Sequence, residues 1–256
     1  MVKGLYTAYT GMLNEQHRMD VMTNNLANAS TVGFKKEGAT SQAFDNVLAL
    51  KIKDTTDAGM AKPLGRMSMG VKIGETYTDF SQGSLRQTDN PYDVAISGNG
   101  FFTIEFKNKA GETSTKYSRD GSFTINKDGY LVTKDGDYVL GTNGRIKLDP
   151  LQGAAIDKDG KIYQNDNLVS TLRITDFEDY NYLEHYGENY FQTVDGATEK
   201  EGDYQTLSGY VEMSNIQVVS EMVQMISISR AYETNQKIIQ TYDSTLEIAA
   251  TQLGKI

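Results

Sequence analysis

The sequence contains no cysteine among its 256 residues. Disulfide bonds and thiolate metal sites are therefore excluded. Two interpretations of this absence stay open. The chain is either a cytosolic protein with no use for thiols, or an exported protein that must stay free of crosslinks on the way. Composition alone favours the first.

Tryptophan is also absent, whereas tyrosine is frequent, with 16 residues. The hydrophobic fraction of 38% is low, which favours wet, amphipathic surfaces over a thick core. No segment reaches ~18 consecutive apolar residues, so we expect no membrane-spanning helix. The N-terminal stretch lacks the apolar region and the cleavage site of a secretory signal, so an exported chain should keep its ends intact.

The formal net charge of −9 argues against a nucleic-acid partner. Most of the excess lies in residues 176–203, where nine acidic residues and one lysine give −8. A solvated face is the favoured interpretation of this segment, with an acidic binding site as the alternative. Residues 1–40 (+1) and 215–256 (−1) are nearly neutral, as close packing against copies of themselves requires.

Both ends of the chain carry a seven-residue apolar repeat, which keeps one seam of a helix facing a partner helix. The N-terminal row is Leu5, Met12, Met19 and Leu26, with Ala8, Met22 and Ala29 three places after members of that row. The C-terminal row is Val218, Met225, Tyr232, Ile239, Leu246 and Leu253. The repeats predict two long helices that pair with each other or with those of a neighbouring chain.

Between the two repeats the pattern changes to period two. Short alternating runs are separated by five turn signals: Asp120-Gly121, Asp128-Gly129, Asp135-Gly136, Asn143-Gly144 and Asp159-Gly160. Such dipeptides are the strongest local signal for β-hairpins. The predicted fold class is therefore α+β, with paired, coiled-coil-like N- and C-terminal helices and a central antiparallel β-rich domain built as a sandwich or open barrel.

The same patterns predict domain boundaries. We expect a helical domain from residues 1–38 with 209–256, and a β-rich outer domain from residues 76–208. Residues 39–75 are expected to form an extended linker, or a short helix carrying Phe44, Val47, Leu48 and Ile52. The Tyr-rich acidic region 180–203 is expected to be a loop. A capping box at Ser214-Asn215-Ile216-Gln217 is expected to start the last helix.

Residues with catalytic or ligand chemistry do not form a recognisable site. Gly98-x-Gly100 lacks the third glycine and the helix of a dinucleotide fingerprint, so a tight hairpin is favoured. Residues 157–160 begin like a calcium loop but lack its spaced ligands and its bidentate Glu. His17 and His185 occur without a zinc-binding pair or a nucleophile turn. We expect no enzyme, no catalytic residue, no metal and no cofactor.

Three sets of motifs stand at both ends and in the middle of the chain. The first is Asn24-Asn25-Leu26-Ala27-Asn28 followed by Thr31-x-Gly33-Phe34-Lys35. The second comprises Gln82-Gly83-x-Leu85, Asp93-Val94-Ala95-Ile96-x-Gly98-x-Gly100-Phe101-Phe102 and Tyr117-x-Arg119-Asp120-Gly121-x-Phe123. The third comprises Gly209-Tyr210-Val211-Glu212, Ser214-Asn215 and Arg230-Ala231-Tyr232-Glu233-x-Asn235-x-Lys237. Together they resemble the bacterial flagellar basal-body rod and hook proteins.

The resemblance implies a structural subunit of the flagellar basal-body rod, in the cell envelope outside the cytoplasmic membrane. It implies export in an unfolded state by the flagellar type III system, and polymerisation through the terminal helices into a hollow, torque-transmitting shaft. The implied partners are copies of itself, other rod and hook proteins and the export apparatus. Length and the single β-domain resemble the distal-rod or neighbouring proximal-rod type, and the match at residues 69–102 favours the distal type.

The expected assembly interface combines both seams with the motif at residues 24–34, which is expected to mark the end of the first helix. Its residues are Leu5, Met12, Met19, Met22, Asn24, Asn25, Leu26, Asn28, Thr31, Gly33, Phe34, Val218, Met222, Met225, Tyr232, Ile239, Leu246 and Leu253. The methionines fit an ordinary core and an adaptable interface equally well, because Met repacks easily. A rival hypothesis is a secreted β-rich module that binds a glycan in an aromatic groove formed by residues 180–190.

Overall fold

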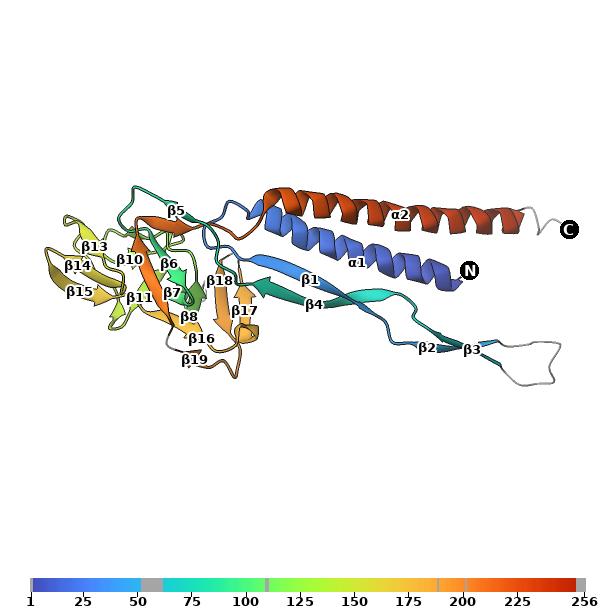
Figure 1. Cartoon of the computed structure of the whole chain (residues 1–256), viewed down its shortest axis with the longest axis horizontal. Coiled ribbons are helices and arrows are strands. Elements are labelled where there is room, and N and C mark those ends of the chain that lie inside the picture. The colour runs from blue at the N-terminus through green and yellow to red at the C-terminus, as the bar shows by residue number, and fades with distance from the viewer. Residues whose placement is uncertain (1, 52–61, 109–110, 188, 201, 252–256) are drawn as a thin grey trace. The chain divides into compact units, whose positions relative to one another are not determined.

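The computed structural model describes residues 2–51, 62–108, 111–187, 189–200 and 202–251. The chain divides into two compact units, and most of their elements are labelled in Figure 1. Unit 1 comprises residues 1–26, 37–78 and 218–256. Unit 2 comprises residues 27–36 and 79–217.

Unit 1 consists of two long helices and two pairs of strands. Helix α1 spans Val2–Ala27 and helix α2 spans Val218–Thr251. The strands are β1 (Lys36–Ala43), β2 (Val47–Lys51), β3 (Lys62–Met67) and β4 (Val71–Asp79), with β1 paired to β4 and β2 to β3. Neither helix, over its described length, combines the extent and the apolarity needed to cross a membrane.

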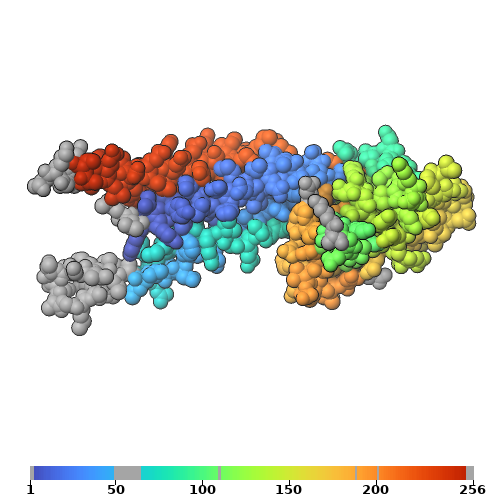
Figure 2. Space-filling model, turned by 180° about the vertical axis from the view of Figure 1, so that it is seen from behind, coloured from blue at the N-terminus to red at the C-terminus, as the bar shows by residue number. Residues whose placement is uncertain are grey.

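Helices α1 and α2 lie side by side (Figures 1 and 2) and approach each other closely at two glycines of α1. A Cβ built on Gly4 would overlap the hydroxyl of Tyr242, and one built on Gly11 would lie 3.1 Å from Nδ2 of Asn235. Glycine, which has no Cβ, permits this approach. Gly11 follows Gly4 by seven residues, whereas its partner Asn235 precedes Tyr242 by seven residues. The two helices therefore run antiparallel.

The strands of unit 1 replace the short helix predicted around Phe44, and that prediction is wrong. Strand β2 occupies this stretch, while the predicted member Ile52 lies outside the described residues. Ser68 Oγ donates to the carbonyl of Phe44 at 3.0 Å, and Asn14 Nδ2 of α1 donates to Ser41 Oγ at 3.0 Å. These partners come from distant parts of the sequence, so the local apolar pattern did not reveal them.

The observed units also differ from the predicted domain boundaries. Residues 37–78 cluster with the two helices, although most of them were assigned to a linker. Residues 27–36 and 209–217, which were assigned to the helical domain, cluster with the β-rich unit. The boundaries between the two units are therefore set by strand pairing and not by the ends of the apolar repeats.

Unit 2 is built almost entirely of antiparallel strands. They are β5 (Leu85–Gln87), β6 (Val94–Gly98), β7 (Phe101–Lys107), β8 (Thr113–Ser118), β9 (Thr124–Ile125), β10 (Leu131–Val132), β11 (Tyr138–Gly141), β12 (Gly144–Arg145), β13 (Ala154–Ile156), β14 (Lys161–Gln164), β15 (Asn167–Thr171), β16 (Ile174–Phe177), β17 (Leu183–Tyr186), β18 (Tyr190–Thr193), β19 (Glu199–Lys200), β20 (Tyr204–Ser208) and β21 (Tyr210–Glu212), with the 3₁₀ turn η1 (Tyr180–Tyr182). The α+β class with a β-rich domain is thus confirmed.

One ten-stranded sheet dominates unit 2. Its main path runs β17-β18-β8-β7-β11-β10-β9, with β12, β16 and β19 attached beside it. The three-stranded sheet β13-β14-β15 and the pairs β20-β6 and β21-β5 complete the unit. Figure 1 shows β7 and β8 inside this group of strands.

Strand β7 separates two hydrophobic clusters because successive side chains of a strand point to opposite faces. Phe102 belongs to the larger cluster, together with buried residues such as Phe123 and Ile162. Phe101 belongs to the smaller cluster, which contains Phe177 and Phe191. The sheet is therefore buried on both faces around β7.

Four of the five predicted turns join hairpins. Gly129, Gly136, Gly144 and Gly160 have positive φ angles of 84°, 93°, 104° and 75° and connect β9–β10, β10–β11, β11–β12 and β13–β14. The fifth predicted turn, Asp120-Gly121, lies in the connection between β8 and β9. There Asp120 Oδ1 accepts a hydrogen bond from Ser122 N at 2.9 Å.

Two further local predictions are wrong. The region 180–203 is not a loop, because β17 pairs with β18 from Leu183↔Thr193 to Tyr186↔Tyr190, and β18 joins β8. Helix α2 begins at Val218, four residues beyond the expected capping serine. The cause is that Asn215 holds the preceding stretch in unit 2, where its Oδ1 accepts from Lys36 N at 2.8 Å.

Candidate functional site

The family-like motifs of unit 2 converge on one buried carboxylate, that of Glu212. Its Oε1 accepts hydrogen bonds from Lys35 Nζ at 2.6 Å and from Gly83 N at 2.9 Å, and its Oε2 from Arg119 Nη1 at 3.3 Å. We call Lys35, Gly83, Arg119 and Glu212 the Glu212 joint. Each member comes from a different segment of the chain, so the joint ties four segments together.

The three charged side chains of the joint are almost fully buried, with exposed fractions of 1% to 3%. Burial lowers the pKa of the Lys35 ammonium, and the Glu212 carboxylate opposes that shift. Burial also lowers the pKa of the Arg119 guanidinium, and Glu212 again opposes the shift. Removing one member of a buried ion pair leaves an uncompensated charge, so the joint holds only when complete.

Two glycines make room for the joint. Gly33 has φ +73° and donates its N–H to the carbonyl of Glu212 at 2.8 Å. A Cβ there would overlap the backbone nitrogen of Asp120, and a Cβ on Gly83 would overlap the carbonyl oxygen of Met213. Gly33 of the first motif, which was predicted as a helix-end signal, and Gly83 of the second set of motifs thus serve close backbone approach.

The asparagines of the first motif have distinct roles. Asn25 is fully buried in unit 1, where its Nδ2 donates to the carbonyl of Glu37 at 2.7 Å and its Oδ1 accepts from Glu37 N at 3.0 Å. Asn28 accepts from Thr31 at both its carbonyl and its Oδ1, at 3.1 and 3.2 Å. Asn24 is exposed. Phe34 is buried beside the ring of His185.

The predicted seam residues occupy environments of several kinds. On α1, Ala8 and Met22 are buried, and Leu5, Met12, Met19 and Leu26 are half-buried. On α2, Met225, Tyr232 and Ile239 are half-buried, whereas Val218, Met222 and Leu246 are exposed. Leu253 lies outside the described residues.

The sequence interpretation missed the second row of the α2 seam. Glu221 and Ile228 are buried, and Asn235, Tyr242 and Ala249 are half-buried. These residues alternate with the predicted row at spacings of four and three, which is the arrangement of a coiled-coil seam. A search for polar and small residues at the second heptad position would have found them, because only Ile228 among them is aliphatic and large.

The sequence interpretation also missed most of an exposed apolar stripe on α2, of which it named only Met222. Val219, Met222, Val223 and Ile226 are spaced i, i+3, i+4 and i+7, so they lie on one face of the helix. Their exposed fractions are 77%, 47%, 62% and 54%. We call these four residues the α2 stripe. It is distinct from the seam that contains Ile228 and Ile239.

Unit 1 also contains an apolar groove of ≈ 450 Å³. It is lined by Lys3 and Tyr6 of α1 and by Phe44, Asp45, Val47 and Met69 of the strand region. Tyr6 and Val47 are each 48% exposed. The groove therefore offers hydrophobic surface with one charge of each sign at its edge.

The tyrosines of residues 180–190 do not form the open groove that the glycan hypothesis requires. Tyr180 packs on Phe80 and Phe101, and its hydroxyl donates to Asp176 at 2.7 Å. Tyr190 is 9% exposed, and its hydroxyl donates to Asp137 at 2.9 Å. These rings are used in packing, and only Tyr182 in this stretch is strongly exposed.

Comparison with known protein families matches three models along the chain. Residues 5–35 match the flagella basal body rod protein model, residues 95–164 the D1 domain of the flagellar hook protein FlgE/F/G, and residues 207–253 the C-terminal model of flagellar basal body rod FlgEFG proteins. The matched ranges contain Lys35, Arg119 and Glu212 of the joint and the whole α2 stripe.

Curated relatives match over nearly the full length. A flagellar hook-basal body complex protein FlhO of Bacillus subtilis is 31% identical over 100% of both chains. A flagellar basal-body rod protein FlgF of Caulobacter vibrioides is 33% identical over 100% of both chains, and an FlgG of Borreliella burgdorferi is 34% identical over 97% of this chain and 98% of its own.

The chain combines a β-rich unit with two long helices, its motif residues make structural contacts, and the proteins that it matches are structural proteins of the flagellum. The chain belongs to the flagellar basal-body rod protein family. It is a structural protein of the bacterial flagellar basal body. Identities of 33% to an FlgF and 34% to an FlgG do not separate the proximal from the distal type.

Proposed function

We propose that the chain polymerises through α1 and α2 into the hollow, torque-transmitting shaft of the rod, with copies of itself and other axial proteins as neighbours. The observation that carries this proposal is the α2 stripe. Monomeric proteins rarely leave large contiguous apolar surfaces uncovered, and such surfaces mark interaction sites. Full burial of each aliphatic side chain is worth ~1.5–3 kcal/mol, so the stripe supplies a substantial association energy once a neighbour covers it.

Within each subunit, α1 and α2 form a coiled-coil-like pair through the seam. Support comes from the approaches at Gly4 and Gly11 and from the four–three spacing of the partly and fully buried residues of α2. The seam and the stripe lie on different faces of α2. The helix can therefore pair within its own chain and still present an apolar face to another copy.

The groove and the α2 stripe are different surfaces at different levels of unit 1. The groove residue Tyr6 is two positions from Gly4, which meets Tyr242, and Tyr242 is 16 residues beyond Ile226. At ~1.5 Å per residue this is ~24 Å along the helix. Contacts between unlike surfaces are heterologous and generate open filaments when the rotation does not close, as a shaft requires.

The Glu212 joint holds together, within unit 2, two segments that lead into unit 1. Lys35 lies two residues before Glu37, where the chain enters unit 1, and Glu212 lies six residues before Val218, where α2 begins. The joint therefore fixes both exits of the chain from unit 2. Export in an unfolded state by the flagellar type III apparatus is part of the same proposal, and a chain without cysteine reaches the assembly site free of disulfide crosslinks.

The substitution Val223→Asp tests polymerisation through α2. Val223 is 62% exposed, so the isolated subunit should keep its circular dichroism spectrum and its urea midpoint. A carboxylate in a buried interface is strongly unfavourable, so cells carrying this variant should lose motility and hook-bearing basal bodies. The matched control is Gln224→Asp, which adds the same charge to an exposed neighbouring position outside the stripe. Normal basal bodies in the Val223→Asp strain would refute the proposal.

A further inference from the structure

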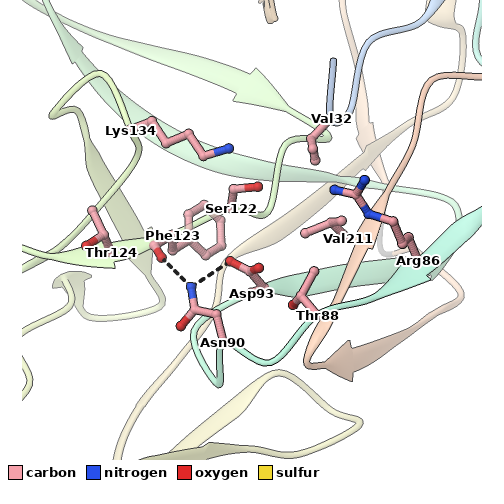
Figure 3. A pocket seen from close by; sticks show the side chains of 10 residues that line it. All are labelled: Val32, Arg86, Thr88, Asn90, Asp93, Ser122, Phe123, Thr124, Lys134 and Val211. Carbon is pink, nitrogen blue, oxygen red and sulfur yellow. Dashed lines mark hydrogen bonds between the residues drawn. The ribbon is translucent and has the colours of Figure 1, made fainter. Parts of the chain in front are cut away.

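A polar pocket in unit 2, separate from the Glu212 joint, holds two cationic side chains. The pocket has a volume of ≈ 260 Å³ and lies where β5, the start of β6 and the chain after β8 meet. Figure 3 shows the guanidinium of Arg86 and the ammonium of Lys134 directed toward one another across it, with the Ser122 hydroxyl between them. Two cationic side chains on one pocket attract an anion that enters it.

Neither cation is neutralised within the part of the chain that the structure describes. Arg86 stands opposite Val211 in the β5–β21 pair, and no hydrogen bond or ion pair to its side chain occurs there. Lys134 follows β10 and is exposed. Asp120 lies within electrostatic range of Lys134, but it is largely buried and its Oδ1 already accepts from Ser122 N.

The floor of the pocket has spare hydrogen-bonding capacity. Thr88 Oγ1 is buried and has no partner among the described residues. The acidic residue of the floor, Asp93, is already held by Asn90, whose Nδ2 donates to Asp93 Oδ1 at 2.8 Å (Figure 3). A buried hydroxyl without a partner carries an energetic penalty that a bound acceptor removes. The pocket thus offers a hydroxyl donor beneath two cations, which is the chemistry that binds a carboxylate.

The same unit carries the complementary charge in its acidic segment, residues 176–203. Of its acidic residues, Glu178 and Asp195 are exposed and their side chains have no hydrogen bond or ion pair within the described part. The surplus of negative charge in this segment matches the two unpaired cations of the pocket.

We propose that the pocket of Arg86 and Lys134 receives a carboxylate side chain from residues 176–203 of a second copy of this chain. The inference rests on the proposed polymerisation and names a contact between β-rich units, in addition to the apolar contacts of the helices. Complementary charges of this kind fix the register between subunits more than they add affinity.

A charge exchange between two variants tests this contact. The pocket variant is Arg86→Glu with Lys134→Glu, and the acid variant is Glu178→Lys with Asp195→Lys. The charge-matched control for the pocket variant is Arg66→Glu with Lys127→Glu, two exposed cations elsewhere. Urea unfolding of each purified full-length variant first verifies that it folds like the unchanged chain.

Cells that produce either variant alone should form far fewer hook-bearing basal bodies, counted by electron microscopy, and the control should match the unchanged chain. Cells that produce both variants together should regain basal bodies, because glutamates in one pocket then meet lysines of the other copy. Failure of co-production to restore them would overturn the inference. A normal count of hook-bearing basal bodies in the acid variant would also overturn the inference. This holds even if succinate, a small dicarboxylate, protects the pocket cations of the purified chain from chemical modification. Val223→Asp tests polymerisation independently of this result.

Discussion

At the scale of single residues, the most important group is the Glu212 carboxylate, which neutralises Lys35 and Arg119 in a site without water access. A complete buried ion-pair site adds little net stability to the folded state. Removal of one of its members, however, destabilises the folded state strongly. The ammonium and the Gly83 amide donate to one carboxylate oxygen of Glu212, and the guanidinium donates to the other. The motif residues around Glu212 are therefore best understood as its partners.

Replacing Glu212 by alanine should lower the free energy of unfolding of unit 2 by about 3–5 kcal/mol, because two buried cations lose their counter-charge. Urea denaturation followed by tyrosine fluorescence measures the loss. The control Glu178→Ala removes an exposed carboxylate and should change stability by less than about 0.5 kcal/mol. Equal effects of the two substitutions would show that the joint does not stabilise the unit.

Tyr117 should make stability fall in alkaline solution. Burial, assisted by Glu199, raises the pKa of its hydroxyl to about 12 from 10.0. The folded state then holds the proton more tightly than the unfolded state, so the stabilisation is complete below pH 10 and is lost as pH rises towards 12. Tyr180, whose pKa burial also raises to about 12, adds to the same decline.

The variant Tyr117→Phe should therefore show a shallower loss of unfolding free energy between pH 10 and 12. It also loses a hydrogen bond of 3.1 Å to Glu199, worth ~1 kcal/mol, which lowers the stability at neutral pH. Urea midpoints measured at each pH, with the exposed Tyr182→Phe as control, separate the two effects. An unchanged slope would contradict the assigned cause.

At the scale of elements, α2 carries two different faces. Its seam contains Ile228, which is 3% exposed, while its stripe contains Val219, which is 77% exposed. Helix α2 has 34 residues, and most of the stability of a helix within a protein comes from the packing of its apolar face. On the proposed assembly, the seam supplies that packing within the chain, and the stripe packs against a second copy.

Truncating these two residues should distinguish the faces. Ile228→Ala should destabilise the helical unit by about 2–4 kcal/mol, because it removes buried methylenes. Val219→Ala should change the stability of the isolated chain by less than about 0.5 kcal/mol. Amide hydrogen exchange of α2 reports both effects, and comparable loss of protection in the two variants would contradict the assignment of the faces.

The sequence revealed those elements whose signal is local. Asp-Gly turns mark hairpins because glycine tolerates positive φ, as Gly129 and Gly136 do here. One heptad row of α2 was visible because its residues are apolar. The second row was not, since Asn235, Tyr242 and Glu221 do not look like core residues in a list of hydrophobicities.

Elements that depend on distant partners were not predictable. Strands β1 and β4 form because each supplies the other's backbone hydrogen bonds, and the intervening residues carry no clear period. The acidic hairpin β17–β18 was taken for a loop because charge hid the alternation that places Leu183 and Phe191 in the core. The motif residues around Glu212 were recognised, but their meeting point depends on four segments that only the fold brings together.

At the scale of the whole molecule, the chain combines a self-sufficient β-rich unit with a helical unit that keeps apolar surface exposed. Membership of the flagellar rod family explains why such an arrangement is useful. On the proposed assembly, the free subunit exposes the α2 stripe, and covering the stripe in the shaft adds stability. The central claim is therefore that a neighbouring subunit covers the α2 stripe.

Thiol labelling tests that claim most directly, because the chain has no cysteine of its own. A Val223→Cys variant and a Lys127→Cys control, both at exposed positions, are treated with a maleimide as free subunits and in purified basal bodies. We predict rapid labelling of both variants in the free chain, and protection of position 223 but not of position 127 after assembly. Labelling of position 223 in basal bodies at the rate of the free chain would contradict the account.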